Sequence, residues 1–542
     1  MAIFGIDLGT TYSCIAQVDD TGRPVVIKNA IGEDSTPSVV FFETPDNVVV
    51  GREAKNSARL YPDLVVSLIK RRIGEDGAEL EIHGVVQTPV SVSALILREL
   101  ARAAGESTHV PVLDVVITVP AYFGVKEREA TRAAGQVAGL NVLNVVPEPV
   151  AAALHYDAFG SAGGERTILV YDLGGGTFDT TVIKISERDV TVVCTDGDHQ
   201  LGGADWDERV ADLLLQRFLE DHPDSDAGSS DEFLQELAVA AEDVKRALST
   251  LESRRQNMRW NGETSRLELT RQSFENATAD LLERTHDITR RTVDTAREKG
   301  VERFDDVLLV GGSTRMPAVR EMLRSRFGFE ARIHDPDLAV AKGAALYALI
   351  ESVRVALPEA AADGAGPAPA ALRDAAADLG IDVENMKQLV GKRVTAVVPR
   401  AFGVKVLAPA DQDADPEGFV VDHLLRANTA LPAEPPAQTY GTAYEGMTGI
   451  NLEIWEQAGA TESARLSDNA KIGEGRIDDL PPMPAQSPVE VTFAMDEMGT
   501  LRVHAVERRT DKELSMELAI TGLSKDRLDE ARSAVAKYAV GA

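Results

Sequence analysis

The chain has 542 residues, of which 44% are apolar, and it carries a formal net charge of −31 at pH 7. This length predicts two or more domains, and the apolar fraction is ample for their cores, which excludes a disordered chain. The large negative charge argues against nucleic acid and anionic membrane as direct partners. The only two cysteines, Cys14 and Cys194, imply neither a disulfide framework nor a cysteine metal site.

The first residues predict a strand with no targeting segment before it. Residues 1–7 contain no basic region of the kind that opens a secretory signal. No stretch of the chain approaches the ~20 consecutive apolar residues that a membrane-spanning helix needs. We therefore expect a soluble, cytoplasmic protein with no membrane partner.

Two glycine-rich turns share one pattern, although they lie far apart in the chain. In each, an apolar strand-like run delivers an aspartate, glycines follow, and a threonine comes after them. Glycines without Cβ let backbone N–H groups approach an anion, the threonine hydroxyl adds a donor, and the carboxylate suits Mg²⁺. One such turn would most simply be a hairpin turn, but two copies predict a nucleotide clamp. The copies contain Asp7, Gly9, Thr10, Thr11 and Tyr12, and Asp172, Gly174, Gly175, Gly176, Thr177 and Asp179.

A third glycine turn follows another buried strand. Residues 307–310 form an apolar run, and residues 317–323 have the apolar spacing of a helix. A base or ribose can lie on bare backbone at such a junction. The turn does not match the P-loop, because no Gly-Lys-Ser/Thr follows at the required spacing. Its residues are Gly311, Gly312, Ser313, Thr314 and Arg315.

Together these turns resemble the actin-like ATPase fold and, within it, the 70-kDa heat-shock chaperones of the DnaK type. Further family-like stretches lie at residues 119–123, 148–153, 201–205 and 337–345. The resemblance covers most of the chain and implies an α/β actin-like ATPase domain over residues 1–353, with two lobes around a nucleotide cleft. Alternating strand-like runs and amphipathic helices agree with α/β layers. The implied cofactors are ATP or ADP and Mg²⁺.

The resemblance also implies roles for residues around the phosphates. Lys70 matches the family's catalytic lysine, and a cation at the γ-phosphate would stabilise charge that develops on the transferred group. Without the resemblance, Lys70 would be a solvated residue in a basic run. Asp7, Glu148, Asp172 and Asp179 would surround Mg²⁺ and the attacking water, with Asp7 and Asp172 as metal ligands through water. Thr10, Thr11, Tyr12 and the catalytic Thr177 would hold the phosphates, and Gly202, Gly203 and Asp337 belong to further nucleotide-binding stretches.

A helix predicted over residues 237–249 resembles the family's base-holding helix. Leu237, Ala241, Val244 and Leu248 fall at helical spacing and would face the core. The opposite side would then meet ribose and adenine. The alternative is an exposed charged face, in which each pair contributes only about 0.2–0.5 kcal/mol. The residues of that side are Glu242, Lys245, Arg246 and Ser249.

The composition changes after the α/β region. Residues 354–393 are rich in Ala, Pro and Gly, and we predict a linker insertion there. Residues 394–521 contain strand-like runs separated by turn signals, which predicts a β-sandwich that resembles the family's peptide-binding domain. These runs are residues 394–398, 402–407, 449–455, 489–493 and 501–506.

Residues 522–542 predict a short C-terminal helix. Leu528, Ala531, Val535 and Tyr538 fall at helical spacing. We expect this face to pack on its own domain, because a short helix needs tertiary contacts to persist. The family's multi-helix lid cannot be built from this segment, so we expect a truncated lid.

Three features depart from the family pattern. The usual leucine-rich acidic linker is replaced by the Ala/Pro/Gly segment, and about 38 flexible residues reach roughly 35 Å, which would weaken interdomain coupling. Asn144 and Pro147 stand where the family commonly has Arg and Asn near its docking surface for J-domain co-chaperones, which leaves that partner open. Ala204 replaces an acidic residue and removes one expected ribose contact.

These features predict an ATP-dependent chaperone of the stress-response type, in which ATP hydrolysis is coupled to protein folding. Its partners would be unfolded or hydrophobic polypeptides and a nucleotide-exchange factor, and we expect a monomer. Two other functions stay open: a metabolite kinase of the same fold, and a nucleotide-dependent scaffold or filament. Lys70 and the β-rich region favour the chaperone.

Overall fold

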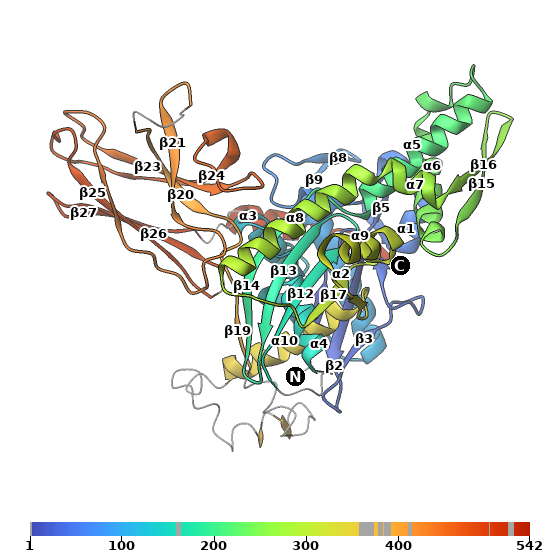
Figure 1. Ribbon diagram of the computed structural model, residues 1–542, viewed down its shortest axis with the longest axis horizontal. Helices are drawn as coiled ribbons and strands as arrows, with labels where there is room; N and C mark the ends of the chain where they lie inside the picture. Colours follow the sequence, from blue (N-terminus) through green and yellow to red (C-terminus); the bar gives the residue numbers. More distant parts are fainter. Residues whose placement is uncertain are drawn as a thin grey trace.

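A mixed α/β region lies beside an all-β region in the computed structural model (Figure 1). This arrangement agrees with the predicted actin-like ATPase domain and β-sandwich. The expected linker at 354–393 lies mostly outside the described residues. The structure describes residues 3–158, 164–356, 373–374, 376–377, 383, 392–409, 415–497, 499–518 and 525–541.

The first lobe contains a six-stranded sheet with the order β11-β10-β1-β2-β3, in which β4 also pairs with β2. Strand β1 runs parallel to β10 and antiparallel to β2. The first glycine turn therefore joins β1 to β2, and Asp7 stands at the end of β1. The strands are β1 (Ile3–Asp7), β2 (Tyr12–Val18), β3 (Pro24–Ile27), β4 (Thr36–Pro37), β10 (Asp114–Val119) and β11 (Asn141–Pro147).

The second lobe repeats this arrangement in a sheet with the order β18-β17-β12-β13-β14-β19. Strand β12 runs parallel to β17 and antiparallel to β13. The second glycine turn joins β12 to β13, where Asp172 is directly opposite Asp179, and the third follows β17. The strands are β12 (Arg166–Leu173), β13 (Phe178–Ile185), β14 (Asp189–Asp198), β17 (Asp306–Val310), β18 (Ala331–Ile333) and β19 (Arg393–Thr395). The first two turns thus occupy equivalent places in two similar sheets.

Helices α4 and α10 pack against each other, and α10 also covers β1 and β2. Their contact depends on glycine, since a Cβ on Gly343 would lie 1.7 Å from Ala151 O. A Cβ on Gly5 of β1 would likewise lie 2.1 Å from the backbone nitrogen of Ala345. Other helices of the two lobes are α2 (Pro89–Thr108), α3 (Val125–Val137), α8 (Ala279–Glu298) and α9 (Pro317–Phe327), and the bounds of the packed pair are α4 (Glu148–Ala158) and α10 (Ala339–Ala356).

Further elements extend each lobe, and the hairpin β15–β16 projects at the upper right of Figure 1. The first lobe adds β5 (Val40–Thr44), β6 (Asn47–Val50), α1 (Arg52–Ser57), η1 (Pro62–Leu64), β7 (Val65–Val66), η2 (Ile69–Arg72), β8 (Leu80–Ile82) and β9 (Val85–Gln87). The second lobe adds α5 (Gly203–Asp221), η3 (Ala227–Ser229), α6 (Asp231–Leu248), β15 (Ser253–Trp260), β16 (Glu263–Thr270), α7 (Arg271–Ala277) and η4 (Gly312–Arg315).

The all-β region forms two four-stranded antiparallel sheets, with the orders β21-β20-β23-β24 and β22-β25-β26-β27. Their inward side chains, including Phe402, Ile454 and Phe493, form one buried core. The predicted alternation of apolar and polar residues therefore produces a sandwich. The elements are β20 (Phe402–Leu407), β21 (Phe419–Leu425), β22 (Gln438–Gly441), β23 (Ile450–Gln457), η5 (Leu466–Asp468), β24 (Asn469–Ile477), β25 (Pro488–Met495), β26 (Leu501–Glu507) and β27 (Lys512–Leu518).

The first run expected in the sandwich, residues 394–398, is divided: Val397 and Val398 pair with residues of the all-β region, whereas the first two residues of the run pair with the second lobe. Residues 393–395 form β19, which pairs in parallel with β14 of the second lobe, and Val394 is opposite Val190. The backbone N–H of Arg393 donates to Arg188 O at 2.7 Å. The edge of β14 accepts this strand because its hydrogen-bonding groups would otherwise lack a protein partner. The expected boundary at residue 394 therefore cuts through a strand of the α/β region.

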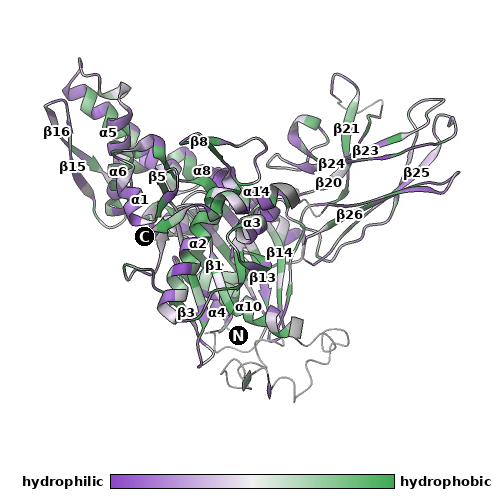
Figure 2. Cartoon of the chain, turned by 180° about the vertical axis from the view of Figure 1, so that it is seen from behind, coloured by the Kyte–Doolittle hydropathy of each residue, from purple (hydrophilic) through white to green (hydrophobic). Residues whose placement is uncertain are grey.

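The last described segment also departs from expectation. Helix α14 (Lys525–Ala536) and β28 (Ala539–Gly541) pack on the first lobe and not on the sandwich, and Figure 2 shows α14 beside α3. Val535 and Tyr538 are buried in the first-lobe core, and Leu528 and Ala531 pack against it. The expected apolar face of the helix exists, but its partner is the ATPase region. The physical reason is the free edge of β6, which β28 extends.

Candidate functional site

Lys70 is a buried cation at the place where the predicted site residues of the two lobes meet. It lies in the 3-10 helix η2, and its ammonium group donates a hydrogen bond to Glu148 Oε1 at 2.6 Å. Its side chain is 3% exposed and lies 5.8 Å from the centre of the Phe123 ring. A solvated residue in a basic run is therefore excluded, because water is replaced around Lys70 by a carboxylate partner and an aromatic face.

Three aspartates lie around this ion pair. Asp172 and Asp179 are buried, whereas Asp7 is partly exposed and accepts a hydrogen bond from the Thr118 hydroxyl at 3.2 Å. Burial, followed by the charge of Glu148, raises the pKa of both Asp7 and Asp179 to about 7. The same two causes raise the pKa of Asp172 well above its usual value. The structure thus brings together the four predicted carboxylates and the predicted lysine.

The charge balance of this group suits a divalent cation. Four carboxylates face one ammonium group, and their mutual repulsion is one cause of the raised pKa values. Mg²⁺ prefers oxygen ligands and usually keeps several waters, so one or two carboxylates are enough to hold it. The donor set therefore fits Mg²⁺, and Asp7 and Asp172 are the residues that would hold it.

The two predicted phosphate turns contact each other directly. A Cβ on Gly175 would lie 2.2 Å from the Thr11 hydroxyl oxygen, and a Cβ on Gly176 would lie 2.3 Å from Cγ2 of Thr10. Gly9 is required within the first turn itself, because a Cβ there would lie 2.0 Å from Tyr12 O. A side chain at Gly175 or Gly176 would push the turns apart, which explains why glycine occupies these two positions.

The stretch at 201–205 lies on the second phosphate turn. Gly203 N–H donates to Gly174 O at 2.9 Å, and a Cβ on Gly202 would lie 2.5 Å from the nitrogen of Gly176. Thr177 is buried in the same turn. Three glycine-rich segments from both lobes therefore meet in one place, where their backbone N–H groups can surround an anion.

The third glycine turn lies next to the second. Gly311 has a φ of +83°, and a Cβ there would lie 2.3 Å from Leu173 O, so that glycine is required on both counts. The Ser313 hydroxyl donates to Gly174 O at 2.9 Å. Arg315 forms an ion pair with Asp337. A Cβ on Gly312 would lie 3.3 Å from Oδ1 of this aspartate. These predicted nucleotide-binding residues therefore border the phosphate turns.

Glu242 on helix α6 connects the two lobes. Its carboxylate accepts a hydrogen bond from the Tyr12 hydroxyl at 3.3 Å and forms an ion pair with Lys55 of α1. The side chain of Arg246 is 66% exposed, and its guanidinium group lies 3.5 Å from the same tyrosine hydroxyl. Lys55 was not predicted, because α1 is a short helix without a recognisable motif.

Lys245 lies on a side of α6 that the protein covers, where α5 packs on α6. It is buried, and its ammonium group donates to Gly203 O and to Asp207 Oδ2, both at 2.8 Å. Its expected contact with ribose or adenine stays a prediction. The Ser249 hydroxyl donates to Lys245 O at 3.3 Å, within its own helix. An exposed charged face therefore describes Arg246 but not Lys245.

The relatives of the chain agree with this geometry. The family model described as "Hsp70 protein" matches residues 3–359 and 412–540. The chain is also 36% identical over 551 aligned residues to "Chaperone protein DnaK" of Deinococcus proteolyticus, covering 95% of this chain and 78% of that protein. The chain belongs to the Hsp70 family. Membership of the Hsp70 family supports a chaperone function and nucleotide binding, and it confirms the family that the sequence motifs indicated.

Among the helices of the described residues, none combines the length and the apolar character needed to cross a membrane.

Arg71 is a cleft residue of this Hsp70-family chain that the motifs did not assign. Its Nε donates to Gly176 O at 2.9 Å, and its two terminal nitrogens donate to the Asp205 carboxylate at 3.2 and 2.5 Å. Asp205 Oδ2 also accepts from Gly202 N–H at 2.7 Å. Arg71 therefore binds η2 of the first lobe to two phosphate segments of the second. Its position beside Lys70 in the sequence was the available signal.

The nucleotide site and the sandwich are joined through Tyr122. Its backbone N–H donates to Asp179 Oδ1 at 3.0 Å, and its hydroxyl donates to Gly459 O at 3.2 Å. The Arg400 guanidinium lies 4.9 Å from the centre of the Tyr122 ring. One residue of the first lobe therefore contacts both a cleft carboxylate and the all-β region.

Glu456 of β23 is the buried acid of this interdomain contact. Its Oε1 accepts from Val125 N–H at 3.2 Å, and a Cβ on Gly124 would lie 2.5 Å from the same oxygen. Arg400 lies 3.2 Å from Glu127 and 4.0 Å from Glu456. Burial raises the pKa of Glu456 to about 7, against the effect of Arg400. The contact is therefore polar, charged and closely packed.

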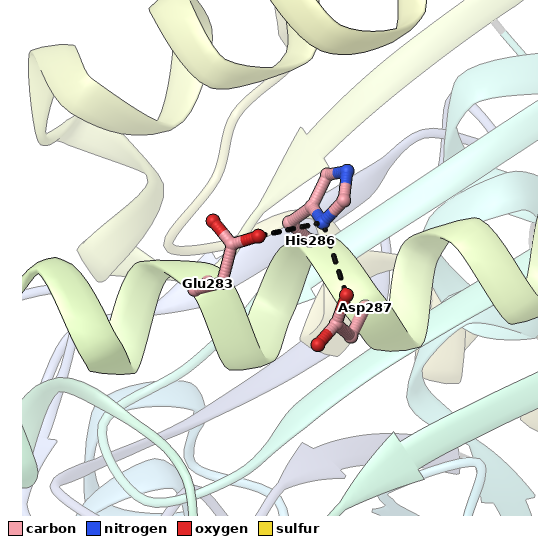
Figure 3. A group of neighbouring side chains, drawn as sticks. All are labelled: Glu283, His286 and Asp287. Carbon is pink, nitrogen blue, oxygen red and sulfur yellow. Dashed lines mark hydrogen bonds and ion pairs between the residues drawn. The ribbon is translucent and has the colours of Figure 1, made fainter.

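A further titratable group on α8 lies outside the cleft. His286 Nδ1 is 3.5 Å from Glu283 and 3.2 Å from Asp287, and Figure 3 shows that all three side chains come from one helix. The imidazole ring also packs on Phe327, with ring centres 5.2 Å apart. Side chains three and four residues apart on a helix, such as Glu283 with His286 and with Asp287, are neighbours without a metal. We assign this group no function.

Proposed function

We propose that the protein is an ATP-dependent chaperone that binds and hydrolyses Mg-ATP in its cleft and binds unfolded or hydrophobic polypeptides on its β-sandwich. One observation supports the ATPase most strongly. Lys70 and Glu148 form a buried ion pair beside three aspartates, at the meeting point of the glycine-rich turns.

In this mechanism Lys70 acts on the transferred phosphoryl group. Its ammonium group is desolvated, and a desolvated cation stabilises developing negative charge better than a solvated one. The phosphates would lie on backbone N–H groups of the turns that contain Thr10, Thr11 and Thr177. Mg²⁺, when bound, would offset phosphate charge near Asp7 and Asp172.

Asp179 and Glu148 are suited to hold the attacking water. The pKa of Asp179 is raised to about 7, so it changes protonation state near neutral pH. The N–H of Tyr122 fixes its orientation. Glu148 is already bound to Lys70, which leaves Asp179 as the better proton acceptor. The absence of a stronger base among the described cleft residues agrees with slow hydrolysis.

The β-sandwich would supply the polypeptide site. An extended peptide gains backbone hydrogen bonds at a sheet edge and buries alternate apolar side chains, which gives modest affinity. We also propose a nucleotide-exchange factor as a partner. The proposal includes no J-domain contact through Asn144, because its side-chain amide is buried and donates to the Tyr347 hydroxyl at 3.1 Å. The metabolite kinase and the filament are not favoured by the family membership.

The test compares Lys70→Ala with the wild-type chain in equilibrium ATP binding and in single-turnover hydrolysis. Removing Lys70 should slow hydrolysis by about 100-fold or more, typical for a group that stabilises transition-state charge, and change ATP affinity far less. Lys28→Ala is a matched control, because Lys28 is an exposed lysine paired with Asp34.

A second measurement adds an unfolded client protein and follows its aggregation by light scattering, with and without ATP. Suppressed aggregation and stimulated hydrolysis are expected. Hydrolysis that is unchanged in Lys70→Ala would remove Lys70 from the mechanism. Phosphorylation of an added metabolite, or nucleotide-dependent pelleting, would instead support the kinase or the filament.

A further inference from the structure

The segment of residues 528–541, here called the anchor segment, is built into the first lobe. Strand β28 pairs in parallel with β6, with Ala539 opposite Asn47 and Val540 opposite Val48. The backbone N–H of Ala539 also donates to Asp46 O at 2.9 Å. This pairing adds a fourth strand to the sheet β28-β6-β5-β7. The edge of β6 is therefore covered by the chain itself.

Tyr538 is the buried side chain at the centre of the anchor segment. It is 6% exposed, and its ring meets Phe42 edge-on with centres 5.7 Å apart. Its hydroxyl accepts a hydrogen bond from Gln87 Nε2 at 2.8 Å. Gln87 is 1% exposed, so removing the tyrosine would deprive a buried amide of a partner. Val535, one turn earlier, is buried in the same core.

Two arginine side chains, one on each side of the contact, link the anchor segment to the first lobe through backbone carbonyl groups. The Arg98 guanidinium on α2 donates to Val535 O and to Tyr538 O, both at 2.6 Å. Arg532 donates to Gln136 O, next to the end of α3, at 3.0 Å. Arg98 thus binds one carbonyl group in the last turn of α14 and one just after that helix ends.

The two connections of the sandwich differ in kind. The contact around Tyr122, Arg400 and Glu456 is polar and charged, whereas the anchor segment buries apolar side chains in the lobe core and shares a β-ladder with β6. Releasing the anchor segment would expose Tyr538 and Val535 to water and leave an open sheet edge. Releasing the polar contact would return charged groups to water, which solvates them well.

We infer that residues 528–541 are a permanent part of the ATPase domain, seated on α2, α3 and β6 in every nucleotide state. The segment is therefore an anchor that returns the chain from the sandwich to the first lobe. Any nucleotide-driven movement of the sandwich takes place between two fixed ends, β19 and α14.

Hydrogen exchange of the full-length chain tests this inference without nucleotide, with Mg-ADP and with Mg-ATP. Amides of residues 538–541 and of β6 should keep the same protection within about twofold in all three states, because they open only with the lobe. Exchange in residues 538–541 that rises tenfold or more in one nucleotide state would overturn the inference.

Two variants make the test independent of ATP binding. Tyr538→Ala should speed exchange in β6 by about tenfold or more and lower the Tm of the first lobe, and the milder Tyr538→Phe should change both less. Tyr444→Ala is the control, because Tyr444 is 63% exposed on the sandwich. If β6 exchange and Tm are unchanged in Tyr538→Ala, the anchor is not part of the lobe. Failure of the proposed ATPase function would appear separately, as nucleotide-independent exchange at residues 174–177.

Discussion

Lys70 and Arg71 are consecutive residues whose side chains act on different parts of the cleft. Lys70 turns to Glu148 among the carboxylates, whereas Arg71 reaches the second phosphate turn and Asp205. The tight winding of the 3-10 helix η2 separates the two side chains by about 120° around its axis. This short helix therefore directs the Lys70 cation to the carboxylate cluster and the Arg71 cation to the phosphate-binding turns.

We predict that Arg71→Ala weakens ATP binding more than it slows bound-state hydrolysis. The substitution removes a bidentate ion pair with Asp205 and the hydrogen bond to Gly176 O, both largely buried. Losing hydrogen bonds to a charged group costs roughly 1.5–3 kcal/mol, so the Kd should rise by about 10- to 100-fold. Equilibrium binding of a fluorescent ATP analogue measures the Kd, and single-turnover kinetics measures the bound-state rate.

Arg72→Ala provides the neighbouring control, because Arg72 is 39% exposed and forms an ion pair with the exposed Glu75. Equal Kd values for Arg71→Ala and Arg72→Ala would contradict a positioning role for Arg71.

Glu456 makes the interdomain contact sensitive to pH. Its pKa is raised from 4.5 to about 7 because it is buried, so the folded protein favours its neutral form. This contribution to stability is complete below pH 4.5 and is lost as the pH rises through about 7. We predict that the Tm of wild type falls relative to that of Glu456→Gln between pH 5 and 8, measured by calorimetry.

The matched control is Glu474→Gln on β24, whose side chain is 60% exposed. A difference between wild type and Glu456→Gln that stays constant across this pH range would mean that Glu456 does not titrate there.

Among the elements, strand β19 changes the expected effect of the altered linker on coupling between the sandwich and the α/β region. A freely jointed chain would transmit little between domains, but residues 393–395 are hydrogen-bonded to β14 immediately before the sandwich begins. The linker that the composition predicted to be flexible therefore extends no further than residue 392. Movement of the sandwich can act on β14, which shares its sheet with the strands that hold Asp172 and Asp179.

We predict that Arg393→Pro reduces the stimulation of ATP hydrolysis by an added hydrophobic peptide. Proline removes the N–H that donates to Arg188 O, and it fixes φ near −65°, which disfavours pairing. Steady-state hydrolysis with and without peptide measures the effect, and a several-fold loss of stimulation is expected with the basal rate nearly unchanged.

Arg393→Ala separates the backbone from the side chain in this experiment. It removes the ion pair with Asp189 but keeps the backbone donor, so stimulation should persist. A deletion of residues 358–370 should also leave stimulation intact. If this deletion abolishes it while Arg393→Pro does not, the inserted segment and not β19 transmits the signal.

For the whole molecule, local patterns predicted the glycine turns and aspartates that the structure brings together in the candidate site. Asp7 and Asp172 were identifiable because each comes directly before its glycine turn, and the requirement for glycine at Gly175 and Gly311 is a local backbone property. The sandwich was predictable because alternation along a strand reports which side faces a core. These signals extend over fewer than ten residues, so a single sequence is enough to find them.

The parts that the sequence did not predict depend on partners far away in the chain. Helical spacing gave the correct apolar face of α14 but not its partner, since nothing near Tyr538 points to Gln87 or to β6. Likewise, the spacing of α6 could not indicate that α5 covers Lys245. Strand β19 resembled the next strands of the sandwich in composition, so only its pairing with β14 distinguishes it.

The positions of β19 and β28 change the division of the chain into domains. Both strands extend sheets of the α/β region, so residues 396–524 are an insertion and the ATPase domain is discontinuous in sequence. A fragment that stopped at residue 356 would expose two sheet edges and leave Phe42 without Tyr538. Replacing the insertion with a flexible loop between residues 395 and 525 would retain both strands, and we expect that redesigned chain to be the more stable, less aggregation-prone ATPase fragment.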